Sequence, residues 1–315
     1  MFCSDESNDA LAESILPAVA PFFLQLPAPR IIMRVVTCCC LLASFLVNAK
    51  ADEPLLQPND RVAILGGTFV ERMQGAGSFE AELQCRRPDW KLSFRNLGWS
   101  GDDVHGVARK RFDGPEDGFQ RLLRDVETAD PSVVLVAYGS AEASDGDPAV
   151  TKFETGLERL VDELQKQKRR IILLTPVAMP GFRVTGYDQS ISECRGIIQR
   201  VGAEHKVPVV TLDWVPDDNE LTEDRLLPNE EGYAALADAA AESLVGGSPC
   251  EESHESVRRR VSEKNQLFFH RYRPQNETYL FLFRKHEQGN NAVEIPQFDP
   301  LIRAADEAIW EAAAH

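Results

Sequence analysis

The chain has 315 residues, of which 43% are hydrophobic and 27% charged, so it is long enough to bury one sizeable core. This composition excludes an intrinsically disordered, a collagen-like or a multi-span membrane protein. The formal net charge of −16 argues against nucleic acids and anionic membranes as partners, because their phosphate groups repel an acidic surface.

A secretory signal peptide is predicted over residues 33–51. It combines Met33 and Arg34, an apolar run over residues 35–47, and an Ala-x-Ala site that ends at Ala51. The run is too short to span a bilayer, so we expect export to the periplasm or the extracellular space, with no stable membrane span after cleavage. An uncleaved anchor or a buried helix is the alternative. Translation starts at either Met1 or Met33, and residues 1–51 form the leader.

Five short apolar runs rich in β-branched residues predict buried strands, and helix-like stretches lie between them. Strands that alternate with helices imply a parallel sheet covered on both faces, with functional residues at the carboxyl ends of the strands. The predicted strands are Arg61–Gly66, Lys91–Leu97, Ser132–Tyr138, Arg170–Val177 and Val207–Leu212. The predicted helices include Phe153–Leu164, Ile191–His205 and Glu230–Leu244.

The alternation of strand-like and helix-like stretches ends after about Gly247. Residues 248–315 are predicted to form a C-terminal extension packed on the main domain, residues 52–247. The extension opens with a basic helix over residues 251–270 and closes with a short helix over residues 297–314. Its basic residues suggest packing against an acidic body. Phe281 and Phe283 alternate with leucines, which is typical of a buried strand.

Four short motifs stand at the predicted strand ends. Gly66-Gly67-Thr68-Phe69 follows the first strand, and a block with Asn96, Gly98, Trp99, Gly101 and Asp102 follows the second. Tyr138-Gly139-Ser140-Ala141-Glu142 follows the third, and Asp224 to Leu227 precede the last main-domain helix. In order and spacing, the set resembles the four blocks of SGNH (GDSL-type) esterases over roughly residues 58–245. The tail, with RPQNETYLF and FRKHEQGNNA, resembles the extension of planctomycete members of that family.

The resemblance implies a three-layer α/β/α sandwich with a five-stranded parallel sheet, flavodoxin-like, plus a C-terminal helical extension. It also implies acyl-ester hydrolysis, in which a serine attacks the ester carbonyl and a histidine three residues after an aspartate removes its proton. A glycine backbone amide and an asparagine side chain stabilise the oxyanion. The nucleophile position falls on Thr68, the oxyanion amide on Gly101 and the triad aspartate on Asp224. Thr68 has a plainer alternative role as the N-cap of the following helix.

Two positions depart from the family pattern. Ala141 stands where the family has its oxyanion asparagine, and losing one such donor costs about 10²–10³ in rate. Leu227 stands at the position of the catalytic histidine, and a leucine cannot accept a proton. Gly139 and Glu142 match the third block, and with Trp99 and Asp102 they are expected to line the binding cleft.

A replacement base would have to come from elsewhere in the chain. His105, at the second block, and the tail histidines His270 and His286 are the candidates that could approach the cleft. A cluster of acids that raises the pKa of one carboxylate is a weaker candidate base. The histidines after the leader are His105, His205, His254, His270, His286 and His315. The candidate acids are Asp102, Asp103, Glu142 and Asp224.

Three hypotheses follow. The first is a degenerate esterase domain, impaired or inactive, that binds an acyl ester or an acylated carbohydrate. The second is an active, atypical hydrolase that uses Thr68 with a non-standard base. The third is a non-catalytic assembly module of a cell envelope. No cofactor and no metal are expected. The three cysteines after the leader, Cys85, Cys194 and Cys250, form no CxxC pattern, and no EF-hand spacing occurs. The oligomeric state stays open.

Overall fold

The computed structural model describes residues 53–212, 220–223, 225–249 and 254–315. The predicted signal peptide and Asp224 lie outside the described residues, so the structure leaves both as predictions. The boundaries drawn after residues 51 and 247 also remain predictions.

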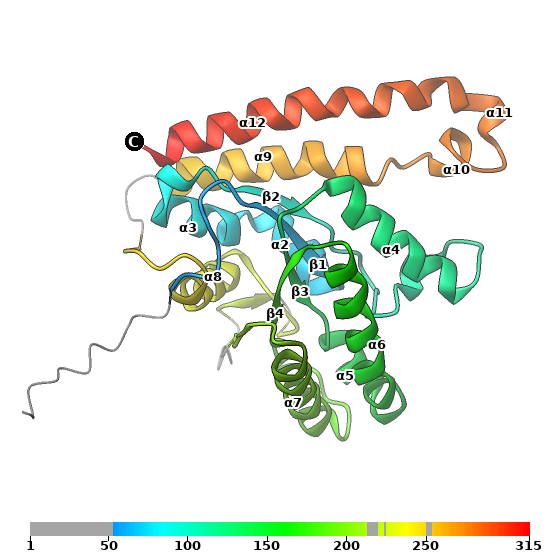
Figure 1. Ribbon diagram of the computed structural model, residues 1–315, viewed down its shortest axis with the longest axis vertical. Helices are drawn as coiled ribbons and strands as arrows, with labels where there is room; N and C mark the ends of the chain where they lie inside the picture. Colours follow the sequence, from blue (N-terminus) through cyan, green and yellow to red (C-terminus); the bar gives the residue numbers. More distant parts are fainter. Residues whose placement is uncertain (1–52, 213–219, 224, 250–253) are drawn as a thin grey trace, which may run out of the picture. The chain divides into compact units, whose positions relative to one another are not determined.

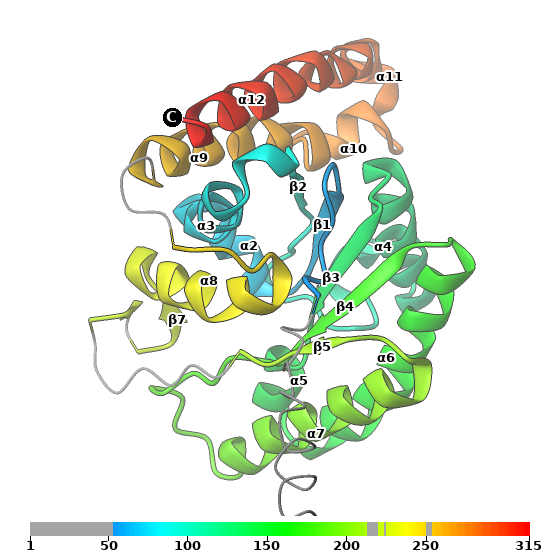
Figure 2. The ribbon, with the colours of Figure 1, turned by 60° about the vertical axis from the view of Figure 1, so that its left-hand side comes forward.

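Five parallel strands form the central sheet, in the order β2-β1-β3-β4-β5 (Figures 1 and 2). They are β1 (Arg61–Gly66), β2 (Ser93–Asn96), β3 (Val133–Ala137), β4 (Arg170–Leu174) and β5 (Val209–Val210). The register pairs Ile64 with Asn96 on one side and with Leu135 on the other. The predicted five-stranded parallel sheet is confirmed, and four of its strands are shorter than their apolar runs.

Successive side chains of each strand point to opposite faces of the sheet, so the strands contribute residues to two hydrophobic cores, one on each face. Ala63 and Leu65 enter the core under α4 (Pro115–Ala129), α6 (Asp147–Lys166) and α7 (Tyr187–His205). Val62 and Ile64 enter the core under α2 (Thr68–Ala76), α3 (Ser78–Arg86) and α8 (Glu230–Leu244). Figure 2 shows α2, α3 and α8 to one side of the strands and α4 and α6 to the other. The three-layer sandwich is therefore confirmed.

Short elements complete the main domain. The 3-10 helix η2 (Pro88–Trp90) precedes β2, and η3 (Val107–Lys110) and α5 (Ser140–Asp145) follow β2 and β3. An antiparallel pair, β6 (Thr222–Glu223) and β7 (Leu227–Pro228), precedes α8. Residues of the predicted motifs lie in the loop after β2, in α5 and in β7, and they line one cavity at the edge where function is expected.

The C-terminal segment is helical, as predicted. It contains α9 (His254–Tyr272), α10 (Glu277–Leu280), α11 (Lys285–Gln288), η4 (Gly289–Gln297) and α12 (Phe298–Ala313). Figure 1 shows α9 and α12 side by side, and α9 also contacts α2, α3 and β2. The expected buried strand around Phe281 is wrong. The chain turns after α10, and the side chains of Phe281 and Phe283 are 45% and 70% exposed.

A buried ion pair fastens α9 to the main domain. Lys264 Nζ lies 2.6 Å from Glu80 Oε2 of α3, and both side chains are at most 3% exposed. The ammonium also donates to the Phe94 carbonyl (3.0 Å), while Asn265 Nδ2 donates to the second Glu80 oxygen (2.8 Å). Every charged atom of the pair therefore has a partner, which a buried pair needs in order to be tolerated.

No helix among the described residues is long and apolar enough to cross a membrane.

Candidate active site

A cavity of about 370 Å³ opens at the carboxyl ends of the strands. It collects residues from all four sequence motifs, although these motifs are far apart in the chain. The predicted site residues that line it are Thr68, Gly101, Asp102, Gly139, Ala141, Glu142 and Leu227. The sheet topology thus brings together these seven residues of the predicted set; Trp99 lies elsewhere, and Asp224 is outside the described residues.

Thr68 is the first residue of α2, directly after the turn that leaves β1. The N-cap of this helix is Gly67, and no side chain caps it, so Thr68 does not have the capping role considered above. Instead, the backbone amide of Gly101 donates to Thr68 Oγ1 at 2.9 Å. The hydroxyl at the nucleophile position and the amide at the oxyanion position are therefore in direct contact at the cavity wall.

The Gly101 loop is fixed against α2 by backbone geometry. Gly101 has φ +74°, in the left-handed region that favours glycine. A Cβ on Gly98 would lie 2.3 Å from the Glu71 amide nitrogen, so only glycine allows this close approach. The Ser100 amide donates to Glu71 Oε2 at 2.6 Å. At the start of the loop, the Gly98 amide donates to Asn96 Oδ1 at 2.9 Å. This loop is therefore held rigidly beside the hydroxyl.

Asp102 lines the cavity, but its carboxylate serves another purpose. It is fully buried in an ion pair with Arg109 (2.6 Å), and it also accepts from the Tyr138 hydroxyl (3.1 Å) and the Ala108 amide (3.1 Å). Burial raises the pKa of Asp102, although Arg109 opposes that shift. With its oxygens bound to these donors, Asp102 holds the loop in place instead of offering a free carboxylate to a ligand.

Trp99 does not line the cavity, which corrects the expectation that it belongs to the binding cleft. Its ring faces the C-terminal helices and lies edge-on to Tyr272, with 6.1 Å between centroids. The guanidinium groups of Arg273 and Arg121 lie 3.9 and 4.8 Å from the ring centroid. The ring turns away because the tail supplies an aromatic and cationic surface for it.

Glu142 is 3% exposed and joins two motifs. Its carboxylate accepts from the Val104 amide at 2.8 Å and from the Gly139 amide at 2.9 Å. Burial raises the pKa of Glu142 to about 7, although these hydrogen bonds act in the opposite direction. Beside it, Ala141 presents only a methyl group where the family carries an amide donor.

None of the six histidines lines this cavity. His105 lies against α6, where a Cβ on Gly156 would be 2.6 Å from its ring. His205 contacts Asp162, His254 contacts Glu82, His270 lies beside Phe298, and His286 is 74% exposed. His315 is the exposed last residue. Leu227, at the family's histidine position, lines the cavity from β7.

An apolar wall of the cavity was missed by the sequence interpretation. Val177, Met179 and Phe182 follow β4, and the wall is completed by Phe69 and Leu226. The Tyr187 hydroxyl accepts from the Met179 amide at 2.9 Å and fixes this loop. The sequence position of this loop could have indicated its role, because it follows the fourth predicted strand and so reaches the same sheet edge as the motifs.

Among the described residues, no group of three or more His, Cys, Asp or Glu side chains gathers as a metal site would require. The cavity therefore presents the Thr68 hydroxyl, the Gly101 backbone amide, the Glu142 carboxyl and an apolar wall.

A doubly covered parallel sheet, with a hydroxyl and a facing backbone amide in a cavity at its carboxyl edge, defines the class of esterase-like α/β proteins. The GDSL-like lipase/acylhydrolase family matches residues 64–235, more than half of the chain, and the chain belongs to this SGNH/GDSL hydrolase family.

Similar solved structures include an α/β-hydrolase enzyme from the metagenome of Lake Arreo, Spain, with 20% identity over 60% of this chain and 98% of that chain (TM-score 0.49). Another is the lipase/acylhydrolase from Enterococcus faecalis, with 22% identity over 61% of this chain and 100% of that chain (TM-score 0.46). A third is an acetyl xylan esterase, with 21% identity over 59% and 100% (TM-score 0.46). No curated protein matches the sequence.

Proposed function

We propose that the chain binds acyl esters, including acylated carbohydrates, in this cavity without hydrolysing them at a measurable rate. The observation that carries the proposal is the absence of an imidazole at the site. Leu227 lines the cavity at the histidine position, and none of the six histidines does. A neutral hydroxyl without a base is a very poor nucleophile at pH 7.

The size and the apolar wall of the cavity support ligand binding. The cavity is open, within the size range of small-molecule sites, and walled by Val177, Met179 and Phe182. An acyl chain would rest on this wall, with its carbonyl oxygen toward the Gly101 amide. An open cavity also disfavours the assembly-module hypothesis, for which a cleft filled by bulky side chains would be expected.

A second candidate function is slow hydrolysis with Glu142 as the non-standard base. The observation in its favour is a cavity-lining carboxyl whose pKa burial raises to about 7, the range that suits a general base. Against it, both oxygens already accept backbone amides. We therefore rank this candidate below the binding function.

Hydrolysis of a short-chain aryl acetate by the purified chain tests both candidates. The informative variant is Leu227→His, which restores the family's Asp-x-x-His spacing to Asp224. Leu226→His is the matched control, because Leu226 also lines the cavity but falls outside the spacing. Thr68→Ala removes the hydroxyl in either background.

The binding proposal expects no wild-type turnover above the Thr68→Ala background. It also expects activity in Leu227→His that Leu226→His lacks and that Thr68→Ala abolishes. Wild-type turnover that Thr68→Ala abolishes would instead establish a working hydrolase. In that case, Glu142→Gln distinguishes the second candidate, because loss of the base removes the remaining rate.

We also propose that the chain is exported, on the basis of the signal-peptide pattern of residues 33–51. Expression in a bacterial host, followed by sequencing the amino terminus of the exported product, should identify Asp52 as its first residue. A product retained in the cytoplasm with its leader intact would contradict export.

A further inference from the structure

A second cavity, of about 510 Å³, lies between α4 and the C-terminal segment. It shares no lining residue with the cavity around Thr68, which we call the ester cavity after its proposed ligand. Its lining is rich in arginine, in a chain whose net charge is −16. The lining holds six arginines and three carboxylates: Arg95, Arg111, Arg121, Arg124, Arg271 and Arg303, with Asp125, Glu277 and Asp299. We call this cavity the arginine cleft.

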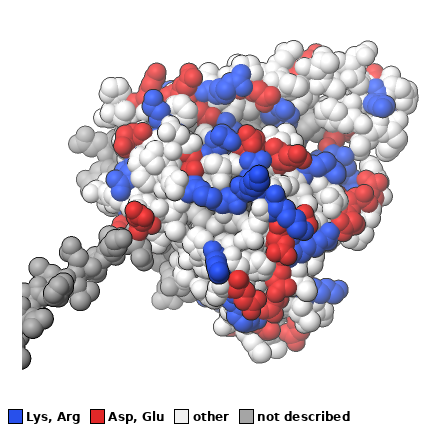
Figure 3. Space-filling model, in the orientation of Figure 1, with Lys and Arg blue, Asp and Glu red and all other residues white. Residues whose placement is uncertain are grey.

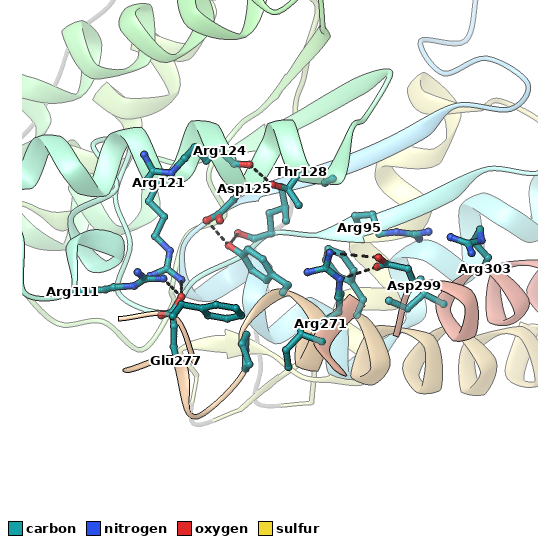
Figure 4. Close-up of a pocket in the computed structure, with 18 residues that line it drawn as sticks. Arg95, Arg111, Arg121, Arg124, Asp125, Thr128, Arg271, Glu277, Asp299 and Arg303 are labelled. Atoms are coloured by element: carbon teal, nitrogen blue, oxygen red, sulfur yellow. Dashed lines mark hydrogen bonds and ion pairs between the residues drawn. The ribbon is translucent and has the colours of Figure 1, made fainter. Parts of the chain in front are cut away.

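Three helices aim their side chains at the cleft. On α4, positions 121, 124, 125 and 128 follow helical spacing, so they share one face. Figure 4 shows Arg111 and Arg121 converging on Glu277 at one end of the cleft. Toward the other end, Arg271 of α9 meets Asp299 of α12, with Arg95 and Arg303 close by.

The three carboxylates do not neutralise the arginines. Glu277 is shared between Arg111 and Arg121. Asp299 pairs with Arg271 (2.8 Å), and Asp125 is bound to Arg109 (3.0 Å), which lies outside the cleft. Among the described residues, Arg124 and Arg303 have no carboxylate partner, so the cleft carries excess positive charge.

The buried end of the cleft also contains unused hydrogen-bond donors. Arg121 is 6% exposed, and its Nε and Nη1 have no hydrogen-bond partner; neither does Nε of Arg111. A buried unpaired donor costs free energy, and the nearby Trp99 ring replaces only part of the missing interaction. Burial and the adjacent Arg111 lower the pKa of Arg121 to about 10, as expected for a cation short of negative charge.

We propose that the arginine cleft binds a small organic oxyanion, a phosphate or sulfate monoester, at a site separate from the ester cavity. Planar guanidinium groups match tetrahedral oxyanions through paired hydrogen bonds. The organic part of the ligand rests on Phe281, Ile295 and Ile302, which line the same cleft.

The surface charge distribution agrees with an anionic ligand. Figure 3 shows Lys and Arg side chains gathered in a band across the middle of one face, below the two long C-terminal helices. Because the chain as a whole is acidic, such local concentration of positive charge would draw anions toward this face.

Calorimetric titration of the purified chain with phenyl phosphate, phenyl sulfate and inorganic phosphate tests the proposal. We expect both esters to bind more tightly than inorganic phosphate, and the two esters to identify the preferred oxyanion. The double variant Arg124→Gln/Arg303→Gln should weaken binding at least tenfold, because it removes two charged donors. Both side chains are exposed, so the fold should tolerate the change.

The matched control is Arg259→Gln/Arg260→Gln, an equal change of charge at exposed positions of α9 outside the cleft. It should leave the affinity within twofold. Phe281→Ser should remove the preference for the aryl esters over inorganic phosphate, whereas Phe283→Ser, outside the cleft, should not. A wild-type chain that binds none of the three probes at millimolar concentration overturns the proposal. Equal weakening by both arginine pairs overturns it as well.

Discussion

Glu142 combines deep burial with a raised pKa, and this sets a pH dependence of stability. Its pKa rises from an ordinary value of 4.5 to about 7, so the folded chain keeps a proton that the unfolded chain has released. The free energy of unfolding should therefore fall as pH rises from 4.5 through 7 and level off above, by up to roughly 3 kcal/mol. Urea denaturation at a series of pH values measures this slope.

Glu142→Gln should flatten that slope. The variant should also lose about 1–3 kcal/mol at low pH, because one amide oxygen replaces the two oxygens that accept from Val104 and Gly139. Glu263→Gln, at an exposed position of α9, should keep the wild-type slope. An unchanged slope in Glu142→Gln would show that other groups produce the pH dependence.

Two glycines, Gly98 beside α2 and Gly75 within it, give opposite expectations for the same substitution. Gly98→Ala would place a Cβ 2.3 Å from the Glu71 amide nitrogen and should destabilise the fold by about 1–3 kcal/mol. Gly75→Ala in α2 meets nothing within 4 Å and should stabilise it by about 0.5–1 kcal/mol. Thermal unfolding of both variants measures the difference, and equal shifts would contradict the close approach at Gly98.

At the scale of elements, the docking of α9 depends on the buried Lys264–Glu80 pair. Lys264→Met leaves a buried carboxylate without its cation and should cost about 3–5 kcal/mol in chemical denaturation. Lys264→Met/Glu80→Met should recover much of that loss, because no unpaired charge remains. Lys166→Met, which breaks an exposed pair with Glu163, should leave stability nearly unchanged, because solvent screens that pair. A Lys264→Met variant as stable as this control would contradict the role of the pair.

The strand pattern predicted the sheet because buried parallel strands have a local signature, a short β-branched run. The same pattern misled at Phe281, because alternation identifies a strand only where a sheet exists to receive it. The tail supplies one buried residue there, Leu280, and two exposed phenylalanines. Strand ends were overestimated for a related reason, since apolar residues continue beyond the last ladder hydrogen bond, as at Val177.

At the scale of the whole molecule, motif order predicted which residues would share the ester cavity, because parallel strands bring their carboxyl ends to one edge. The orientation of Trp99 could not be predicted in that way. It depends on Tyr272 and Arg273, which lie more than 170 positions later. The arginine cleft could not be predicted for the same reason, since its lining is divided among β2, α4 and the helices and loops of the C-terminal segment.

The tail's contacts with the main domain imply that the two unfold together. Lys264 is bound to Glu80, Arg273 to Glu71, and Trp310 Nε1 donates to the Leu92 carbonyl at 2.7 Å. Hydrogen exchange should therefore give α9 and α8 the same opening free energy, because α3, which carries Glu80, packs against both helices. The four-residue helices α10 and α11 should exchange much faster and serve as the internal reference. If α9 exchanges while α8 stays protected, the tail opens as a separate unit, and the support it gives to Trp99 and the Gly101 loop would be lost during that opening.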